Sequence, residues 1–188
     1  MKSFKVPTRE MVSANNQAIF DRFTKQLGFM PNLIAMLAHS ETALADYLPF
    51  QSRKGTLTIK EKEVIYLVVS EINDCKYCVP GHTAIAKGLG FSEEQILDIR
   101  RADIPFDQKL NALAVFVKET TLNKGRPGAA SIEAFFKAGY NEASLIDVII
   151  AIGDKVIMNY LHNITQVPVE WPAVPAINET AIASVVQG

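Results

Sequence analysis

Apolar residues recur along most of the chain at the three- and four-residue spacing of amphipathic helices, and no segment alternates convincingly in the manner of a strand. This pattern predicts an all-α fold. Two of the expected helices begin with a capping box, Thr58-x-x-Glu61 and Ser92-x-x-Gln95. The expected helices cover about 13–28, 33–38, 40–53, 58–72, 78–90, 92–102, 107–123, 131–138 and 141–166.

An internal similarity suggests how these helices are organised. The pattern of residues 90–99 resembles that of residues 139–148, at a constant offset of 49 residues. We therefore predict a duplicated three-helix unit, with one copy over 58–102 and the other over 107–150. The alternative is a chance similarity, because capped amphipathic helices resemble one another. Only the first copy contains thiols, so it is the expected redox unit.

The composition changes after Gln166. Prolines at positions 168, 172 and 175 exclude a continuing helix, so residues 167–188 are expected to form an extended arm on this subunit or on a neighbour. At 188 residues, 48% of them hydrophobic, the chain is expected to form one domain over 1–188. This apolar content, a near-neutral charge and the apolar arm together predict a homo-oligomer.

Charge and hydropathy exclude several classes of partner. The chain has 19 Lys and Arg against 20 Asp and Glu, with no basic run of the kind that binds nucleic acid. We find no segment with the apolar length of a signal peptide or of a membrane span. The expected location is therefore the cytoplasm.

Both cysteines of the chain lie in one short motif, Cys75-x-x-Cys78, which is followed by His82. On a helix, Cys78 and His82 stand one turn apart on the same face, where an imidazole can accept a proton from a thiol. The Cys-x-x-Cys spacing also permits a disulfide. In a reducing compartment this motif indicates redox chemistry or metal binding rather than a structural crosslink.

A proline constrains where the helix of this motif begins. Pro80 lies between Cys78 and His82, and proline is tolerated in the first turn of a helix but not further inside. The helix should therefore begin near Cys78 or Val79. Cys78 would then lie at the helix N-terminus, where the helix dipole favours a thiolate.

Reduction of an O–O bond also requires a proton donor for the departing oxygen, which typically contributes about 10² to 10⁴-fold. Glu63, Glu71 and Asp74 are the nearby candidates. Glu71 and Asp74 lie at a polar helix end, where a solvated role, or an N-cap for Asp74, is the ordinary expectation. Glu63 precedes a run of apolar residues, Val64–Val69, and could be either a relay carboxylate at the edge of the core or a first-turn glutamate favoured by the dipole.

The spacing from Glu63 through Cys75-x-x-Cys78 to His82 resembles the signature of AhpD-like alkylhydroperoxidases in the carboxymuconolactone decarboxylase superfamily. Two other segments, 28–33 and 159–163, resemble the peroxidase-related branch of that group, so the resemblance covers most of the chain. It implies an AhpD-like helical bundle, usually oligomeric, that reduces hydroperoxides through thiols.

The resemblance also implies roles for individual residues. Cys78 would be oxidised to a sulfenic acid, Cys75 would be its resolving partner and proton donor, and His82 with Glu63 would relay protons. The catalytic cycle would pass through a Cys75–Cys78 disulfide, and Glu71 would have only a surface role. The implied partners are a hydroperoxide and a dithiol, or a thioredoxin- or lipoyl-type reductant, with no cofactor.

Two other functions remain open on the sequence alone. A zinc module could use Cys75, Cys78 and His82, with His39, His162 or a carboxylate as fourth ligand, although zinc sites usually draw a second ligand pair from elsewhere in the chain. Both histidines could equally be ordinary buried or interface residues. A non-peroxidatic relative, either a lactone decarboxylase or a redox sensor, is the other alternative, but decarboxylation does not need a thiol pair.

Overall fold

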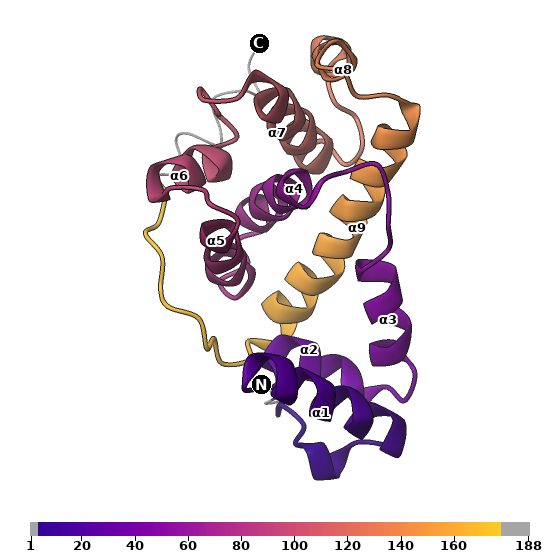
Figure 1. Cartoon of the computed structure of the whole chain (residues 1–188). Coiled ribbons are helices and arrows are strands. Elements are labelled where there is room, and N and C mark those ends of the chain that lie inside the picture. The colour runs from indigo at the N-terminus through magenta and orange to yellow at the C-terminus, as the bar shows by residue number, and fades with distance from the viewer. Residues whose placement is uncertain (1–3, 178–188) are drawn as a thin grey trace.

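A computed structural model describes residues 4–177, and within that range the chain forms helices and no strands (Figure 1). The α-helices are α1 (Ala14–Leu27), α2 (Asn32–Met36), α3 (Ala43–Gln51), α4 (Ile59–Ile72), α5 (Cys78–Gly88), α6 (Glu93–Arg101), α7 (Gln108–Leu122), α8 (Ala129–Lys137) and α9 (Glu142–Thr165). Short 3₁₀ turns occupy Arg9–Met11 and Leu37–His39. The all-α prediction is confirmed.

Local capping explains where α4 and α6 begin. The Thr58 side chain accepts a hydrogen bond from the Glu61 backbone N–H, and the Glu61 carboxylate accepts one from the Thr58 N–H at 2.8 Å. Ser92 and Gln95 form the same reciprocal pair at the start of α6. Both capping boxes predicted from the sequence are therefore present, because they depend only on residues within one turn.

Helix α4 lies at the centre of the fold. Every residue from Val64 to Ser70 is buried, because α5, α6, α7 and α9 pack around this helix (Figure 1). The main core combines its apolar side chains with those of α6, α7 and α9. A second apolar cluster surrounds the two cysteines with residues of α2, α3 and α9; its buried members are Leu33, Met36, Tyr47, Cys75, Tyr77, Cys78, Met158 and Val167.

The two segments that resemble each other begin with similar turns. Gly90 and Gly139 both have positive φ, 88° and 95°, and each is followed two residues later by an N-cap, Ser92 or Asn141. Glycine adopts this left-handed backbone without the steric cost that a Cβ adds. The similarity of the turns agrees with the sequence pattern, while the duplication of the whole unit stays a prediction.

The C-terminal arm lies on its own subunit as far as residue 177. Figure 1 shows it leaving α9 near α2 and passing α5 toward α6. The Asn32 side chain donates to the Pro168 carbonyl at 3.0 Å, while the Asn32 N–H and the Tyr77 hydroxyl donate to the Glu170 carboxylate at 2.7 and 2.6 Å. The rest of the predicted arm, residues 178–188, lies outside the described range.

Candidate functional site

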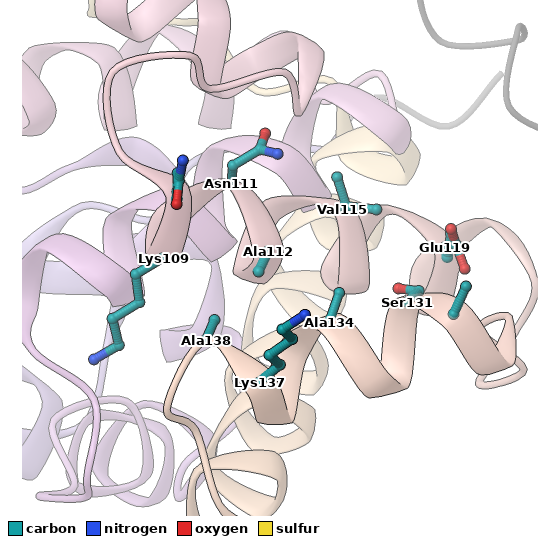
Figure 2. A pocket seen from close by; sticks show the side chains of 11 residues that line it. Lys109, Asn111, Ala112, Val115, Glu119, Ser131, Ala134, Lys137 and Ala138 are labelled. Atoms are coloured by element: carbon teal, nitrogen blue, oxygen red, sulfur yellow. The ribbon is translucent and has the colours of Figure 1, made fainter.

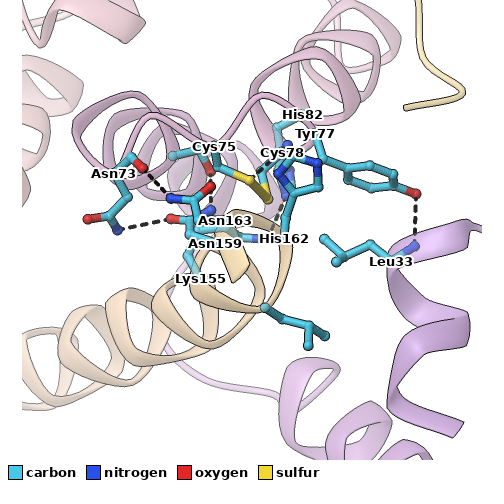
Figure 3. Close-up of a disulfide and its surroundings, with 12 residues drawn as sticks. Leu33, Asn73, Cys75, Tyr77, Cys78, His82, Lys155, Asn159, His162 and Asn163 are labelled. Carbon is cyan, nitrogen blue, oxygen red and sulfur yellow. Dashed lines mark hydrogen bonds between the residues drawn. A yellow bond between two sulfur atoms is a disulfide. The ribbon is translucent and has the colours of Figure 1, made fainter. Parts of the chain in front are cut away.

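Cys75 and Cys78 form a disulfide, with their Cα atoms 5.3 Å apart (Figure 3). Cys75 precedes α5 and Cys78 is the first residue of that helix. The Cys78 backbone N–H donates to the Cys75 sulfur at 3.2 Å, and both residues are buried. The prediction that this spacing permits closure is confirmed.

The turn before the disulfide is set by local backbone geometry. Asp74 adopts a left-handed conformation with φ 49°, and the Cys75 N–H then bonds back to the Ser70 carbonyl at 3.0 Å. Pro80 is in the first turn of α5, where its missing N–H costs no helical hydrogen bond. The predicted helix start is therefore correct, but the predicted N-cap role of Asp74 is wrong: its exposed carboxylate instead pairs with Lys76.

His82 and Glu63 meet in the folded chain, although 19 residues separate them in the sequence. The His82 Nδ1 lies 2.6 Å from the Glu63 carboxylate, and the Glu63 side chain is only 5% exposed. Helix α4 supplies the carboxylate and α5 supplies the imidazole. Of the two interpretations left open for Glu63, the structure favours the carboxylate at the edge of the core over the solvated first-turn glutamate.

A third group, Lys155 of α9, was not predicted. Its Nζ lies 2.6 Å from the His82 Nε2 and 4.3 Å from the centre of the Tyr66 ring. Lys155 is buried, and burial lowers its pKa while the nearby carboxylates of Asp154 and Glu63 oppose that shift. The sequence does show Lys155 beside Asp154 within a largely apolar helix. The hydrophobic pattern gave no indication that this pair lies near the cysteines.

These contacts define the protonation state of His82. Burial lowers the pKa of His82, the Lys155 charge lowers it further, and Glu63 opposes the shift. Since an ammonium can only donate, Nε2 accepts from Lys155 and the ring proton resides on Nδ1, from which it is donated to Glu63. Both nitrogens of His82 are therefore occupied while the disulfide is closed, which the helical spacing alone did not reveal.

The other two histidines occupy different environments. His162 is buried on α9, packs 5.5 Å from the Tyr77 ring, and lies among the side chains around the disulfide (Figure 3). Burial lowers the pKa of His162. His39 is instead exposed, and its Nε2 contacts the Lys5 carbonyl at 2.9 Å. Residues 4–177 contain no group of three or more His, Cys, Asp or Glu side chains arranged to hold a metal ion.

Residues 38–118, which span α3 to α7 and include Glu63, both cysteines and His82, match the model of the carboxymuconolactone decarboxylase family. The family recognised from the motif is thus confirmed over this range. Lys155 and His162 lie outside it, on α9.

Solved structures of peroxidase-related proteins share the fold of the whole chain. An uncharacterized peroxidase-related protein from Silicibacter sp. TM1040 is similar with a TM-score of 0.77 and 21% identity, over 87% of this chain and 89% of that one. The alkylhydroperoxidase AhpD core of an uncharacterized peroxidase-related protein from Ralstonia eutropha JMP134 gives 0.74 and 20%, over 86% and 88%. At these identities the likeness establishes the AhpD-like fold.

A third similar structure has a different recorded activity. It is a cysteine-to-alanine variant of the debrominase Bmp8 in complex with 2,3,4-tribromopyrrole, with a TM-score of 0.74 and 14% identity over 90% of this chain and 93% of that one. A comparison with curated proteins found no match. Across residues 4–177, the structure has no helix with the length and apolarity needed to cross a membrane.

Helix α9 also holds the turn that leads to the cysteines. The Asn73 amide donates to the Asn159 Oδ1 at 3.0 Å, and the Asn163 amide donates to the Asn73 carbonyl at 2.7 Å (Figure 3). Asn159 also donates to the Ser70 hydroxyl at 3.1 Å. The segment 159–163 resembled the peroxidase-related branch in the sequence. In the structure its asparagines hold the C-terminal end of α4 by hydrogen bonds.

A cavity of about 870 Å³ lies beneath the C-terminal arm and reaches the disulfide on its Cys75 side. Cys75, Val79, Pro80 and Trp171 are among the residues that line it, whereas Cys78 is not. Cys78 instead packs in the apolar cluster with Met36, Tyr77 and Met158. Of the two cysteines, Cys75 is therefore the one that borders the cavity.

Glu71 lies at the edge of the same cavity, and its predicted surface role is wrong. Its carboxylate accepts a hydrogen bond from the Arg100 guanidinium at 2.7 Å, and the two side chains are only 13% and 3% exposed. The partner is 29 residues away, so sequence proximity to the cysteines did not reveal the pairing. A second cavity, of about 730 Å³ between α7 and α8, contains none of the site residues (Figure 2).

Proposed function

We propose that this chain is a thiol-dependent hydroperoxide reductase that cycles through the Cys75–Cys78 disulfide. The observation that supports this proposal most directly is the pairing of the two cysteines beside a buried Glu63–His82–Lys155 chain. A redox-active thiol pair supplies the electrons, and the chain of titratable groups can deliver protons. The AhpD-like fold is consistent with this assignment.

In the oxidising half of the cycle, the Cys78 thiolate attacks one oxygen of the hydroperoxide. An S–O bond forms, the O–O bond breaks, and the departing alkoxide takes a proton and leaves as an alcohol. Sulfur is oxidised to a sulfenic acid and the peroxide is reduced. The location of Cys78 at the N-terminus of α5 favours the thiolate that starts this step.

Cys75 then resolves the sulfenic acid. Its thiol attacks the Cys78 sulfur, a water molecule leaves and the disulfide forms. The backbone separation of 5.3 Å lies within the range that disulfides normally span. The Cys78 N–H, which is 3.2 Å from the Cys75 sulfur, can stabilise negative charge on that sulfur before closure.

The reducing half would begin at Cys75, because Cys75 borders the cavity beneath the arm and Cys78 does not. A thiolate of the reductant attacks Cys75 and forms a mixed disulfide, and Cys78 leaves as a thiolate. A second thiol of the reductant then attacks the mixed disulfide and frees Cys75. This order requires a dithiol, in agreement with the thioredoxin- or lipoyl-type reductant expected from the family resemblance.

Single-cysteine variants test these roles. Cys78→Ser should abolish hydroperoxide reduction, whereas Cys75→Ser should still react once and accumulate a sulfenic acid. Steady-state assays with hydrogen peroxide and an organic hydroperoxide, combined with dimedone labelling and mass spectrometry, distinguish the two. In the unmodified chain, one equivalent of peroxide should lower the number of free thiols from two to none.

The proton relay is tested in the same assay. Glu63→Gln keeps the size of the side chain but removes its charge, and should slow reduction by about 10²-fold or more. Glu93→Gln, which removes a carboxylate from an exposed side chain at the start of α6, is the matched control and should leave the rate unchanged. A dimedone label on Cys75, or retention of both free thiols after peroxide treatment, would contradict the assignment of roles.

Reductive debromination is the second candidate, because the debrominase Bmp8 shares this fold. The same assay should therefore include 2,3,4-tribromopyrrole with a dithiol. We expect hydroperoxide consumption without release of bromide. Bromide release that depends on Cys78, in the absence of hydroperoxide turnover, would assign the site to dehalogenation instead.

A further inference from the structure

His162 is a buried histidine to which the proposed cycle has given no role. It lies on α9 with only 2% of its surface exposed, and within residues 4–177 its Nδ1 is a buried polar atom without a hydrogen-bond partner. Leaving such an atom unpaired costs free energy, so buried polar groups nearly always find partners. A partner that is present only in another redox state of the chain would explain the exception.

The His162 ring is neutral and carries a free lone pair. Burial lowers its pKa, and hydrogen bonding to the Val167 backbone and the Asn163 side chain only opposes that shift. A neutral imidazole carries its proton on one nitrogen and a lone pair on the other. Because Nδ1 has no acceptor within reach, the proton resides on Nε2 and the Nδ1 lone pair stays free.

His162 lies on the side of the disulfide where Cys78 packs. The centre of its ring is 5.5 Å from that of Tyr77, the residue before Cys78, and Figure 3 shows the side chain pointing from α9 toward the sulfur atoms. Met158, one turn earlier on the same face of α9, belongs to the apolar cluster that contains Tyr77 and Cys78. Neither His162 nor Cys78 borders the cavity beneath the arm. His162 and Cys78 thus share the enclosed side of the disulfide, whereas Cys75 reaches the cavity.

The other buried histidine near the thiols is not free to accept a proton. Both nitrogens of His82 are engaged, Nδ1 by the Glu63 carboxylate and Nε2 by the Lys155 ammonium, each at 2.6 Å. A thiol is a weak nucleophile until a neighbouring base removes its proton. The site therefore needs a second basic group beside Cys78, and the free lone pair of His162 meets that need.

We propose that His162 is the base that accepts the thiol proton of Cys78, a role that rests on the hydroperoxide reductase function proposed above. In the reduced chain the Cys78 S–H donates to the His162 Nδ1 and then transfers its proton, which leaves a thiolate beside an imidazolium. The thiolate attacks the hydroperoxide and becomes a sulfenic acid. The departing alkoxide takes its proton from the Glu63–His82 pair, so the two histidines have separate tasks.

Closure of the disulfide returns His162 to its starting state. When Cys75 attacks the Cys78 sulfur, the S–O bond breaks, and the hydroxyl takes the proton from the His162 imidazolium and leaves as water. The proton of the Cys75 thiol replaces the one that the Glu63–His82 pair gave to the alkoxide. His162 then ends neutral with Nδ1 unpaired, as it is in the structure with the disulfide closed.

Ionisation of the Cys78 thiol tests the proposal. In a reduced Cys75→Ser chain, the thiolate absorbance at 240 nm reports on Cys78 alone. Adding His162→Gln, which keeps a polar side chain of similar size but removes the base, should lower this absorbance several-fold at pH 7, toward the roughly 3% thiolate of an ordinary cysteine. His39→Gln is the matched control: His39 is exposed and contacts the Lys5 carbonyl, so the absorbance should not change. Circular dichroism of each variant verifies that the helices are intact.

Nitrogen-15 NMR of the unmodified chain tests the same contact without any substitution. With the disulfide closed, the His162 Nδ1 should resonate as an unprotonated nitrogen, and reduction with dithiothreitol should shift it toward a hydrogen-bonded or protonated one. The His39 resonances should not move. Equal Cys78 thiolate absorbance with His162→Gln and with His39→Gln, or a His162 Nδ1 resonance that reduction leaves unchanged, would overturn the proposal. Neither measurement uses a hydroperoxide, so a failure here is distinct from a failure of the proposed function, which the peroxide assay detects.

Discussion

At the scale of single residues, Lys155 controls what His82 can do. Its ammonium lies 2.6 Å from the His82 Nε2 and lowers the pKa of the imidazole. While this contact lasts, Nε2 cannot accept a proton from Cys78. We therefore place Lys155 in the proposed relay as a positioning residue that keeps His82 neutral and its proton on Nδ1, toward Glu63.

Lys155→Met should raise the pKa of His82, because it removes the neighbouring positive charge. The resonances of the three histidines can be followed by NMR as a function of pH. Hydroperoxide reduction should slow in the same variant. Lys118→Met is the control, because Lys118 is also buried, at 5% exposure, but lies on α7, whereas the charges that shift the pKa of His82 are those of Lys155, Glu63 and Asp154. An unchanged His82 pKa in Lys155→Met would remove Lys155 from the relay.

Sequence reasoning identified Cys75, Cys78 and His82 because they share one turn and the start of one helix. The position of Glu63 before an apolar run left two interpretations of its role. Lys155 was missed since its contact with His82 spans 73 residues and depends on the packing of α9 against α5. Site residues that are neighbours in the sequence can therefore be predicted from it. Site residues that tertiary packing brings together cannot.

At the scale of elements, the connection between α3 and α4 is attached to α9 by one carboxylate. Asp147 accepts hydrogen bonds from the Thr56 N–H at 2.6 Å and from the Arg53 guanidinium at 2.6 Å. These donors, led by the Thr56 backbone, hold the pKa of Asp147 below its usual range. Gly55 lies beside this carboxylate, and a Cβ there would be 2.5 Å from the Asp147 Oδ2.

Gly55→Ala should therefore destabilise the chain by about 1–3 kcal/mol, because the Asp147 carboxylate must leave its donors to avoid the added methyl group. Urea unfolding followed by circular dichroism measures the change. Gly88→Ala is the matched control: nothing lies within 4 Å of its Cβ position at the end of α5, and it should be neutral or stabilising by about 0.5–1 kcal/mol. Equal effects of the two substitutions would contradict the steric argument.

The existence of the helices was predictable, and so were the starts of α4 and α6, because the side-chain caps Thr58 and Ser92 act within four residues. The predicted starts of α3 at Ser40 and of α8 at Ser131 were wrong, because these helices begin without a side-chain cap at Ala43 and Ala129. Contacts between helices were harder to predict from the sequence. The pairing of Glu71 with Arg100 and the course of the arm over α5 both depend on how the helices pack. The positive-φ turn at Asp74 was not predicted, since an aspartate at this position is compatible with either a helix cap or a turn.

At the scale of the whole molecule, a central α4 is surrounded by helices, and the Cys75–Cys78 disulfide lies where this core meets the N-terminal helices and the arm. The fold class followed from periodicity alone, because an amphipathic pattern requires only that each helix bury one face. The hydrophobic pattern did not predict that the C-terminal arm covers the cavity beside Cys75. That arrangement requires residues 169–177 to lie opposite α4 and α5.

The arm also carries a tryptophan whose fluorescence should depend on whether the Cys75–Cys78 disulfide is closed. Trp171 is the only tryptophan, and its indole nitrogen lies 3.1 Å from the position of a Cβ at Gly81, in the first turns of the helix that Cys78 begins. Disulfides quench indole emission, so reduction with dithiothreitol should increase tryptophan fluorescence, and hydroperoxide should reverse the increase. A Cys75→Ser, Cys78→Ser double variant should show neither change. The proposed redox cycle can then be followed in real time without any attached dye.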